Sequence, residues 1–353
     1  MSTLMSKLKK ASSIKEAEVL SQSTLFVDKS TTPTPIYALN VALSGDIDGG
    51  FRSGLISLAG PSRHFKSTYA LVLASAYLKR HQDAILVLYD CEFGISEATL
   101  VAAGISPDRV LHIPITSVEE LKFDLMKKLT GADAIKRGEK VIFMVDSIGN
   151  LASTKETSDA EKESAATDMG TRAKSIKSLW RLVTPHLTIK DLSLLAIQHV
   201  YEEQGMFAKT IMSGGTSGML SSDVVFFIGK SQEKDGTDLV GWNFKLKVEK
   251  SRYVKEKSVI PIVVTFEGGI QRYSGILEWA IESGHVIKPS NGWYQLVDKE
   301  TGEIIGGKVR EKDTANEEFL GKVVSNPSFK EWVRKQFQLS HGTLVAEDDP
   351  SSN

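Results

Sequence analysis

Short, nearly continuous hydrophobic runs alternate with amphipathic segments along the chain. The apolar runs cover residues 55–60, 84–90, 109–115, 141–147 and 192–200. Runs of this length predict strands that are buried on both faces of a parallel sheet. Between them, residues 67–80, 117–129 and 168–182 predict helices. The alternation predicts an α/β fold with right-handed crossovers.

The pattern changes toward both ends of the chain. The runs DVVFFIGK, WNFKLKVEK and IPIVVTFE follow one another with little helix between them, which predicts that the sheet continues in antiparallel fashion. Residues 1–30 are polar and partly helical, with TTPTP as a linker. Residues 292–339 predict a short hairpin, a loop and a last helix, FKEWVRKQF. The final AEDDPSSN is expected to be disordered.

Composition narrows the class of protein. A chain of 353 residues that is 41% hydrophobic can bury a full core. Its apolar runs fall far short of the roughly 20 residues that span a bilayer, so no membrane association is expected. A single cysteine, Cys91, predicts a reducing compartment. The formal net charge of −1 excludes a globally basic nucleic-acid-binding protein, so any DNA surface is local.

The stretch GPSRHFKST resembles a phosphate-binding loop with one substitution. Gly60, Lys66 and Ser67 match the pattern G-x-x-x-x-G-K-[ST], and Phe65 replaces its second glycine. A predicted strand precedes the loop and a predicted helix follows it, so main-chain N–H groups and a helix N-terminus meet where phosphates bind. The alternative is an ordinary strand-to-helix loop with a chance match.

Acidic residues at two further strand ends favour the nucleotide interpretation. Asp146 ends the run VIFMVDS, where a carboxylate would hold magnesium together with Ser67. Asp90 and Glu92 end another strand in LYDCEFG, where a carboxylate orients an attacking water. Each acid alone is common at a strand end, but their combination with the loop is not.

Several longer stretches carry a family resemblance, which extends from residue 33 to residue 339. They are LNVALSGDIDGGFRSGLISLAGPSRHFKS, LYDCEFG, VIFMVDSIGNLAS, VEKSRYVKEKS and GILEWAIESGHVIKPSNGWY. In these the chain resembles the RecA family of strand-exchange recombinases, and in particular its UvsX-type phage members, which share the loop phenylalanine. The resemblance implies a RecA-like P-loop ATPase core with a mixed, mainly parallel sheet flanked by helices.

The resemblance also implies a division of the chain. Residues 1–32 form an N-terminal helical docking segment and linker, 33–285 the ATPase core, 286–340 a small α+β C-terminal region and 341–353 a disordered tail.

By the same resemblance, Glu92 activates the hydrolytic water, Lys66 contacts the phosphates and His199 senses the γ-phosphate of ATP. Mg²⁺ binds to Ser67 and Asp146. The nucleotide-binding residues are Gly60, Pro61, Ser62, Arg63, His64, Phe65, Lys66, Ser67, Thr68, Thr99 and Phe266. Thr99 stands where relatives carry a tyrosine that stacks on adenine, and Phe266 is either another adenine contact or a core residue.

Two segments are candidates for DNA binding. Lys174, Lys177 and Arg181 share one face of a helix and match family residues that contact the DNA backbone; without the resemblance they are an ordinary solvated face. Residues 202–220 are glycine-rich and irregular, with Gly214 and Gly215 expected at phosphates and Met206 or Phe207 either between bases or packed inward. The irregular, charged residues 152–168 correspond to the other DNA loop of the family.

Lys250 and Arg252 match two basic residues that, in this family, reach the ATP of a neighbouring subunit; otherwise they are an exposed basic edge.

The implied function is an ATP-dependent strand-exchange recombinase that forms a helical filament on single-stranded DNA and pairs it with double-stranded DNA. The implied partners are a single-stranded-DNA-binding protein and a recombination mediator. The expected location is the cytoplasm, that of the host if a phage encodes the chain. The alternatives are a RecA-like hexameric helicase and a non-catalytic regulator of a recombinase.

Overall fold

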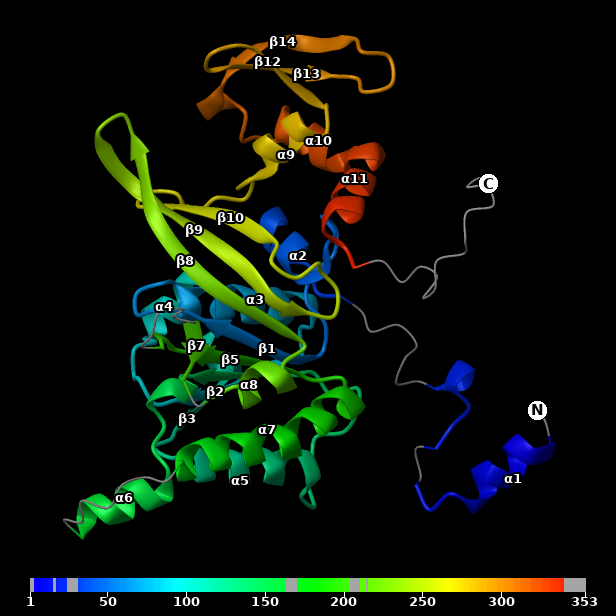
Figure 1. The fold of residues 1–353 in the computed structure, drawn as a ribbon, viewed down its shortest axis with the longest axis vertical. Coiled ribbons are helices and arrows are strands. Elements are labelled where there is room, and N and C mark those ends of the chain that lie inside the picture. The colour runs from blue at the N-terminus through cyan, green and yellow to red at the C-terminus, as the bar shows by residue number, and fades with distance from the viewer. Residues whose placement is uncertain are drawn as a thin grey trace.

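A mixed nine-stranded sheet forms the centre of the protein (Figure 1). The structure, a computed structural model, describes residues 3–14, 17–23, 31–162, 170–203, 210–213 and 215–339. The strand order is β11-β10-β9-β8-β1-β5-β4-β2-β3. The six strands from β8 to β3 in this order pair in parallel, and β8 to β11 pair antiparallel. The predicted fold class, with a mixed and mainly parallel sheet, is confirmed.

The strands of this sheet are β1 Gly54–Ala59, β2 Ile85–Asp90, β3 Val110–Pro114, β4 Val141–Asp146, β5 Ser193–Gln198, β8 Val224–Asp235, β9 Asp238–Ser251, β10 Val259–Thr265 and β11 Gly269–Ile270. A two-stranded hairpin joins β6 Val200–Glu202 to β7 Thr210–Met212. The helices of the core are α2 Tyr37–Ser44, α3 Lys66–Arg80, α4 Glu97–Ala102, α5 Val118–Thr130, α6 Thr154–Glu161, α7 Thr171–Lys190 and α8 Ser217–Ser221.

Helices cover the parallel part of the sheet on both faces because its strands are apolar on both faces. Along β4, Ile142 and Met144 belong to the core beneath α2 and α3, whereas Phe143 and Val145 belong to the core beneath α5 and α7. All four side chains are fully buried. The run VIFMV does not alternate between apolar and polar residues because β4 packs against an apolar core on each face of the sheet.

The outermost parallel strand, β3, departs from the predicted double burial. It lies at the end of the sheet beyond β2, and Leu111 is 48% exposed. An edge position and a central position give similar apolar runs, so the sequence alone did not separate them.

The helix α7 is longer than predicted. It continues past residue 182 through Pro185 to Lys190. Proline disfavours a helix interior, yet Leu187, which follows it, is fully buried in the core beneath the helix. Tertiary packing therefore overrides the local break.

Two segments expected to be irregular contain regular elements. Within residues 152–168, Ser153 and Glu156 form a capping box that begins α6. Within residues 202–220, β7 and α8 are ordered, and Met212 at the end of β7 is buried. The predicted strand of residues 192–200 ends at Gln198, and Val200 begins β6.

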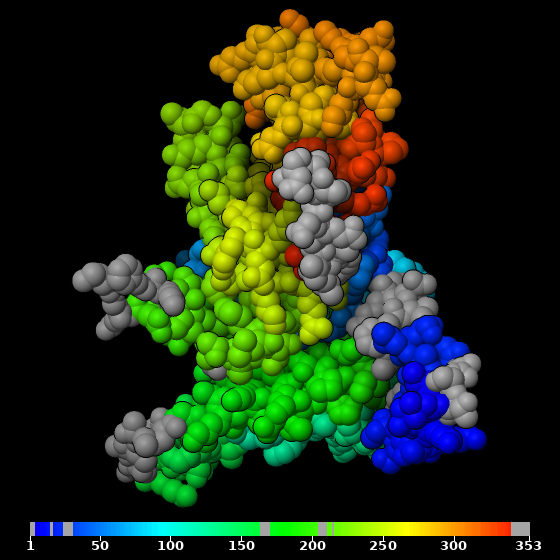
Figure 2. Space-filling model, turned by 45° about the vertical axis from the view of Figure 1, so that its right-hand side comes forward, coloured from blue at the N-terminus to red at the C-terminus, as the bar shows by residue number. Residues whose placement is uncertain are grey.

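The C-terminal region is more elaborate than the predicted hairpin, loop and helix. It follows α9 Ile276–Glu282 and contains β12 Val286–Ser290, β13 Trp293–Val297, β14 Ile304–Arg310, α10 Leu320–Ser325 and α11 Pro327–Phe337. The strands form a three-stranded sheet, which appears as an orange lobe above the core (Figure 2). Buried His285 joins this sheet to α11, because its ring bonds to Ser283 (2.9 Å) and Ser328 (2.7 Å).

At the other end, α1 Thr3–Ala11 stands to the side of the core (Figure 1). Leu4 and Leu8, one helical turn apart, are 65% and 60% exposed. Among the residues that the structure describes, no helix is both long enough and apolar enough to span a membrane.

Candidate nucleotide and DNA site

The phosphate-type loop connects β1 to α3, as the sequence predicts. Phe65, which replaces the glycine, adopts a left-handed conformation with φ of 58°, and Arg63 does the same with φ of 61°. Such angles are unfavourable for a bulky side chain. Packing holds Phe65 in place, since its ring lies 4.9 Å from that of Phe244 on β9. The neighbouring Lys230 ammonium lies 3.4 Å from the Arg63 carbonyl oxygen.

Gly60 follows β1 at a point of close approach. A Cβ at this position would lie 3.1 Å from the carbonyl oxygen of Ile228 on β8. The N–H of Gly60 donates to the Gln198 carbonyl (3.2 Å), which ties the loop to the end of β5.

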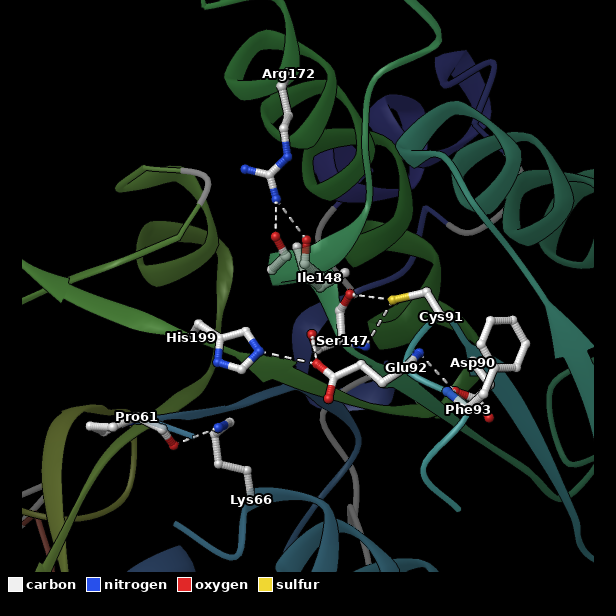
Figure 3. Close-up of polar contacts among 11 residues, drawn as sticks. Pro61, Lys66, Asp90, Cys91, Glu92, Phe93, Ser147, Ile148, Arg172 and His199 are labelled. Atoms are coloured by element: carbon white, nitrogen blue, oxygen red, sulfur yellow. Dashed lines mark hydrogen bonds and ion pairs between the residues drawn. The ribbon is translucent and has the colours of Figure 1, made fainter. Parts of the chain in front are cut away.

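Lys66 begins α3 and points into the loop. It is buried, and its ammonium donates to the Pro61 carbonyl oxygen at 2.8 Å (Figure 3). Burial lowers the pKa of Lys66, and the charges of Glu92 and Asp146 oppose that shift. A buried cation at the start of a helix is suited to anionic oxygens.

Ser67 and Asp146 form the candidate magnesium site. Burial raises the pKa of Asp146 to about 6, with a contribution from the charge of Glu92, whereas the hydrogen bond with Ser67 lowers it. Within the described ranges, the buried Oδ1 of Asp146 has no hydrogen-bond partner. An unpartnered carboxylate oxygen beside a hydroxyl suits Mg²⁺, which uses one or two carboxylates and completes its shell with phosphates and water. These residues therefore fit the ion.

Glu92 follows β2 in a turn fixed by Asp90, whose Oδ1 accepts the N–H groups of Glu92 (3.1 Å) and Phe93 (2.7 Å). The Glu92 carboxylate accepts hydrogen bonds from the Ser147 hydroxyl and from His199 Nε2, the latter at 3.0 Å (Figure 3). Partial burial raises the pKa of Glu92, but the bonds from Ser147 and His199 outweigh it, so the pKa lies below its usual value. Glu92 is therefore ionised at neutral pH.

The strands β1, β2, β4 and β5 end at one edge of the sheet, and a cavity of about 240 Å³ lies there. Its lining residues are Ser62, Arg63, His64, Phe65, Lys66, Ser67, Thr68, Glu92, Asp146, Ile197 and His199. Ligand pockets usually measure about 300–1,000 Å³, so this one suits a phosphate chain rather than a whole nucleotide.

Two predicted base contacts lie outside this cavity. Thr99 is exposed on α4, where its N–H donates to Ser96 Oγ at 3.2 Å. Phe266 is 60% exposed and packs edge-on against Trp242, so its alternative role as a core residue is wrong. Neither side chain is among those that line the cavity.

The predicted DNA-binding stripe lies on one face of α7. Lys174, Lys177 and Arg181 are exposed, whereas Ile176, Leu179, Trp180 and Val183 are buried against the sheet. Of the other candidates, Gly215 is described: it lies between β7 and α8 and has a φ of 82° with open space where a Cβ would be. Met206, Phe207 and Gly214 fall outside the residues that the structure describes.

Lys250 and Arg252 lie far from the phosphate loop of their own subunit. Arg252 pairs with Asp223 (2.8 Å), and Asp223 accepts the N–H of Leu55 near the start of β1. The Lys250 ammonium donates to the carbonyls of Met219 (3.2 Å) and Leu220 (2.6 Å). The phosphate loop begins where β1 ends. At about 3.3 Å per residue along the strand from Leu55, this loop lies roughly 16 Å from the Arg252–Asp223 pair.

The sequence interpretation missed two residues of the site. Ser147 follows Asp146 at the same strand end, which is a usable signal. Arg172 donates to the carbonyl oxygens of Ile148, Gly149 and Leu151. Carbonyl acceptors have no side-chain signature, so nothing in the sequence marks this contact.

Comparisons with known proteins show which proteins this chain is similar to. The family described as "Bacteriophage T4, Recombination and repair protein, C-terminal domain" matches residues 273–333. The whole chain aligns at 49% identity with the "Recombination and repair protein" of Enterobacteria phage T4 and covers 91% of it. It is 25% identical to RecA of Paenarthrobacter aurescens, over 77% of this chain and 75% of that protein. It is 26% identical to RecA of Corynebacterium urealyticum, over 91% and 81%.

Proposed function

This chain belongs to the RecA family of strand-exchange recombinases, in the branch of the phage T4 recombination and repair protein, and from this we propose how it works. It is a DNA-dependent ATPase that assembles on single-stranded DNA and exchanges strands with a homologous duplex.

The observation that carries the proposal is the convergence of four charged or titratable side chains on one cavity. Glu92, Asp146 and His199 come from the ends of three parallel strands, Lys66 begins α3 after the loop that follows a fourth, and all four line the cavity. Binding sites of α/β proteins lie at this edge of the sheet. A non-catalytic regulator would not need a positioned carboxylate there.

When bound, Mg²⁺-ATP supplies a phosphoryl group whose oxygens carry the developing negative charge. The Lys66 ammonium is positioned for those oxygens, and Ser67 and Asp146 would hold the metal. Ionised Glu92 accepts a proton from the attacking water. His199, bonded to Glu92, makes the position of this base sensitive to the state of the β6–β7 segment that follows it.

We place the nucleotide base outside the phosphate cavity, against Phe266. Its exposed ring offers a stacking surface, and Thr99 offers only a hydroxyl. Base selectivity therefore rests on few contacts.

An open filament is the proposed assembly. The N-terminal segment, residues 1–32, presents an exposed apolar stripe at Leu4 and Leu8 that would dock on the next subunit. A head-to-tail contact of this kind propagates instead of closing. A single-stranded-DNA-binding protein and a recombination mediator are the proposed helpers of assembly.

The proposed function predicts ATP-dependent formation of joint molecules from circular single-stranded DNA and a homologous linear duplex. Gel electrophoresis measures these products, with omitted ATP and a non-homologous duplex as controls. Electron microscopy with a non-hydrolysable ATP analogue should show helical filaments. Closed rings that unwind a forked duplex without any strand exchange would instead identify a helicase.

The α7 stripe gives a prediction for DNA affinity. Replacement of Lys174, Lys177 and Arg181 by alanine should weaken binding to single-stranded DNA at every sequence, since each phosphate that a cation neutralises releases counterions. The slope of log K against log salt should become shallower by about 0.7 for each phosphate that is no longer neutralised. Fluorescence anisotropy at several salt concentrations measures it.

The matched control removes three exposed lysines on other elements, Lys79, Lys127 and Lys136. It alters net charge equally and should leave the slope close to that of the unmodified protein. Equal slopes for both triple variants would show that the stripe is merely solvated.

A further inference from the structure

Arg172 stands at an electrostatically unfavourable place. It lies in the first turn of α7, where residues 171–174 include two basic side chains and no acidic one. The N-terminus of a helix carries a partial positive charge, so a cation there is destabilising. A compensating contact is therefore required.

That contact is a three-fold grip on one turn of the main chain. Arg172 Nε donates to the Leu151 carbonyl oxygen at 2.6 Å. Its Nη2 donates to the carbonyl oxygens of Ile148 (2.9 Å) and Gly149 (2.7 Å), which are the two contacts drawn in Figure 3. The rigid, planar guanidinium fixes these three oxygens relative to one another and to the axis of α7.

The gripped turn lies between the two side chains of the proposed hydrolytic pair. Ser147, directly before it, donates its hydroxyl to Glu92 and accepts a hydrogen bond from Cys91 Sγ at its carbonyl oxygen (3.0 Å). Gly149 lies against the other member, because a Cβ there would be only 2.6 Å from Cδ2 of His199. A displacement of the turn would thus change the surroundings of both Glu92 and His199.

The helix that carries Arg172 also carries the DNA-binding stripe, which begins two residues later at Lys174. We propose that Arg172 is a positioning residue that couples DNA bound on α7 to the Glu92–His199 pair. The coupling rests on the proposed function. A shift of α7 on its DNA ligand is transmitted through the guanidinium to the turn, and from the turn to the catalytic carboxylate.

Arg172→Gln tests this coupling in the full-length protein. At saturating single-stranded DNA, kcat for ATP hydrolysis should fall by about 10-fold to 100-fold, as expected when a catalytic group is displaced. KM for ATP and the affinity for DNA should stay within about two-fold, since the three carbonyl oxygens that Arg172 holds belong to residues outside the lining of the phosphate cavity and outside the α7 stripe. Arg172→Lys keeps the charge but not the fork, so its kcat should be intermediate.

Lys190→Gln is the matched control on the same helix, because it also removes a cation that donates to a main-chain carbonyl oxygen, that of Ile135. It lies at the other end of α7, so kcat, KM and DNA affinity should all stay close to those of the unmodified protein. Unchanged kcat in Arg172→Gln would overturn the proposal, as would a loss confined to DNA affinity. Thermal unfolding of each variant detects a folding defect. If Arg172→Gln does not fold, the kcat of Arg172→Lys is compared with that of the unmodified protein instead.

A pH profile separates this proposal from the proposed function. Without DNA, Arg172→Gln should move the acidic limb of the ATPase profile to higher pH, because a loosened Ser147 no longer favours ionised Glu92. If the unmodified protein hydrolyses ATP without stimulation by DNA, the proposed function and the coupling to DNA both fail, and a shift of this limb would then show only that Arg172 positions Ser147. A DNA-stimulated protein whose Arg172→Gln variant keeps kcat and the acidic limb leaves the proposed function intact and overturns the coupling alone. An unmoved acidic limb would show that Arg172 is only structural, and absence of hydrolysis would overturn both.

Discussion

Glu92→Gln should lower ATP hydrolysis by about 10²-fold or more while nucleotide binding is retained. The amide keeps the shape of the carboxylate and can still pair with Ser147 and His199, but it cannot accept the proton of the attacking water. Because ATP stays bound and is not hydrolysed, filaments of this variant should persist. Steady-state phosphate release, nucleotide affinity and electron microscopy measure the three properties.

Lys66→Ala is the contrasting variant at the same site. It removes the cation that we propose faces the phosphates, so both nucleotide affinity and turnover should disappear with the fold retained. The two variants thus differ in ATP affinity and in filament stability. Normal turnover in Glu92→Gln would transfer the role of base to another group.

Arg252→Ala should abolish DNA-stimulated hydrolysis without abolishing ATP binding. Arg252 pairs with Asp223 beside the start of β1, nearly the length of that strand from its own phosphate loop. Arg252 is therefore too far away to act on the nucleotide of its own subunit. In a filament, Arg252 of one subunit can instead reach the ATP of its neighbour and act as an arginine finger. Lys250→Ala should behave in the same way.

Mixed filaments decide whether Arg252 acts in trans. Arg252→Ala and Glu92→Gln subunits, each inactive alone, should recover part of the ATPase activity when they co-assemble. Some junctions then join an intact Glu92 to an intact Arg252 from the neighbour. Co-assembly without any recovery, with co-assembly checked by energy transfer between labelled subunits, would leave Arg252 as an exposed residue that only pairs with Asp223 after β9, a strand that lies inside the sheet and not at its edge.

The structure also explains why a phosphate loop without its second glycine is tolerated. Phe65 takes the left-handed conformation that glycine would supply, and Phe244 of β9 packs against its ring. The sequence shows that position 65 is unusual. Phe244, which holds Phe65 in its left-handed conformation, lies 179 positions later in the chain, on a strand of the antiparallel part of the sheet.

The sequence by itself determined the order of strands and helices, the phosphate loop and the acids at strand ends. These features are written in neighbouring residues, where hydrophobic period and loop chemistry act locally. The antiparallel continuation after β8 was equally predictable, because β-rich runs without intervening helices leave no room for parallel crossovers.

Only the tertiary structure decided which residues meet. Glu92, Ser147 and His199 follow three different strands, and their hydrogen bonds depend on strand order and on the angle of each turn. The edge position of β3 and the passage of α7 through Pro185 likewise depend on neighbours that local patterns do not encode. The grip of Arg172 on three carbonyls is the extreme case, since every residue carries that acceptor and only the folded chain selects among them.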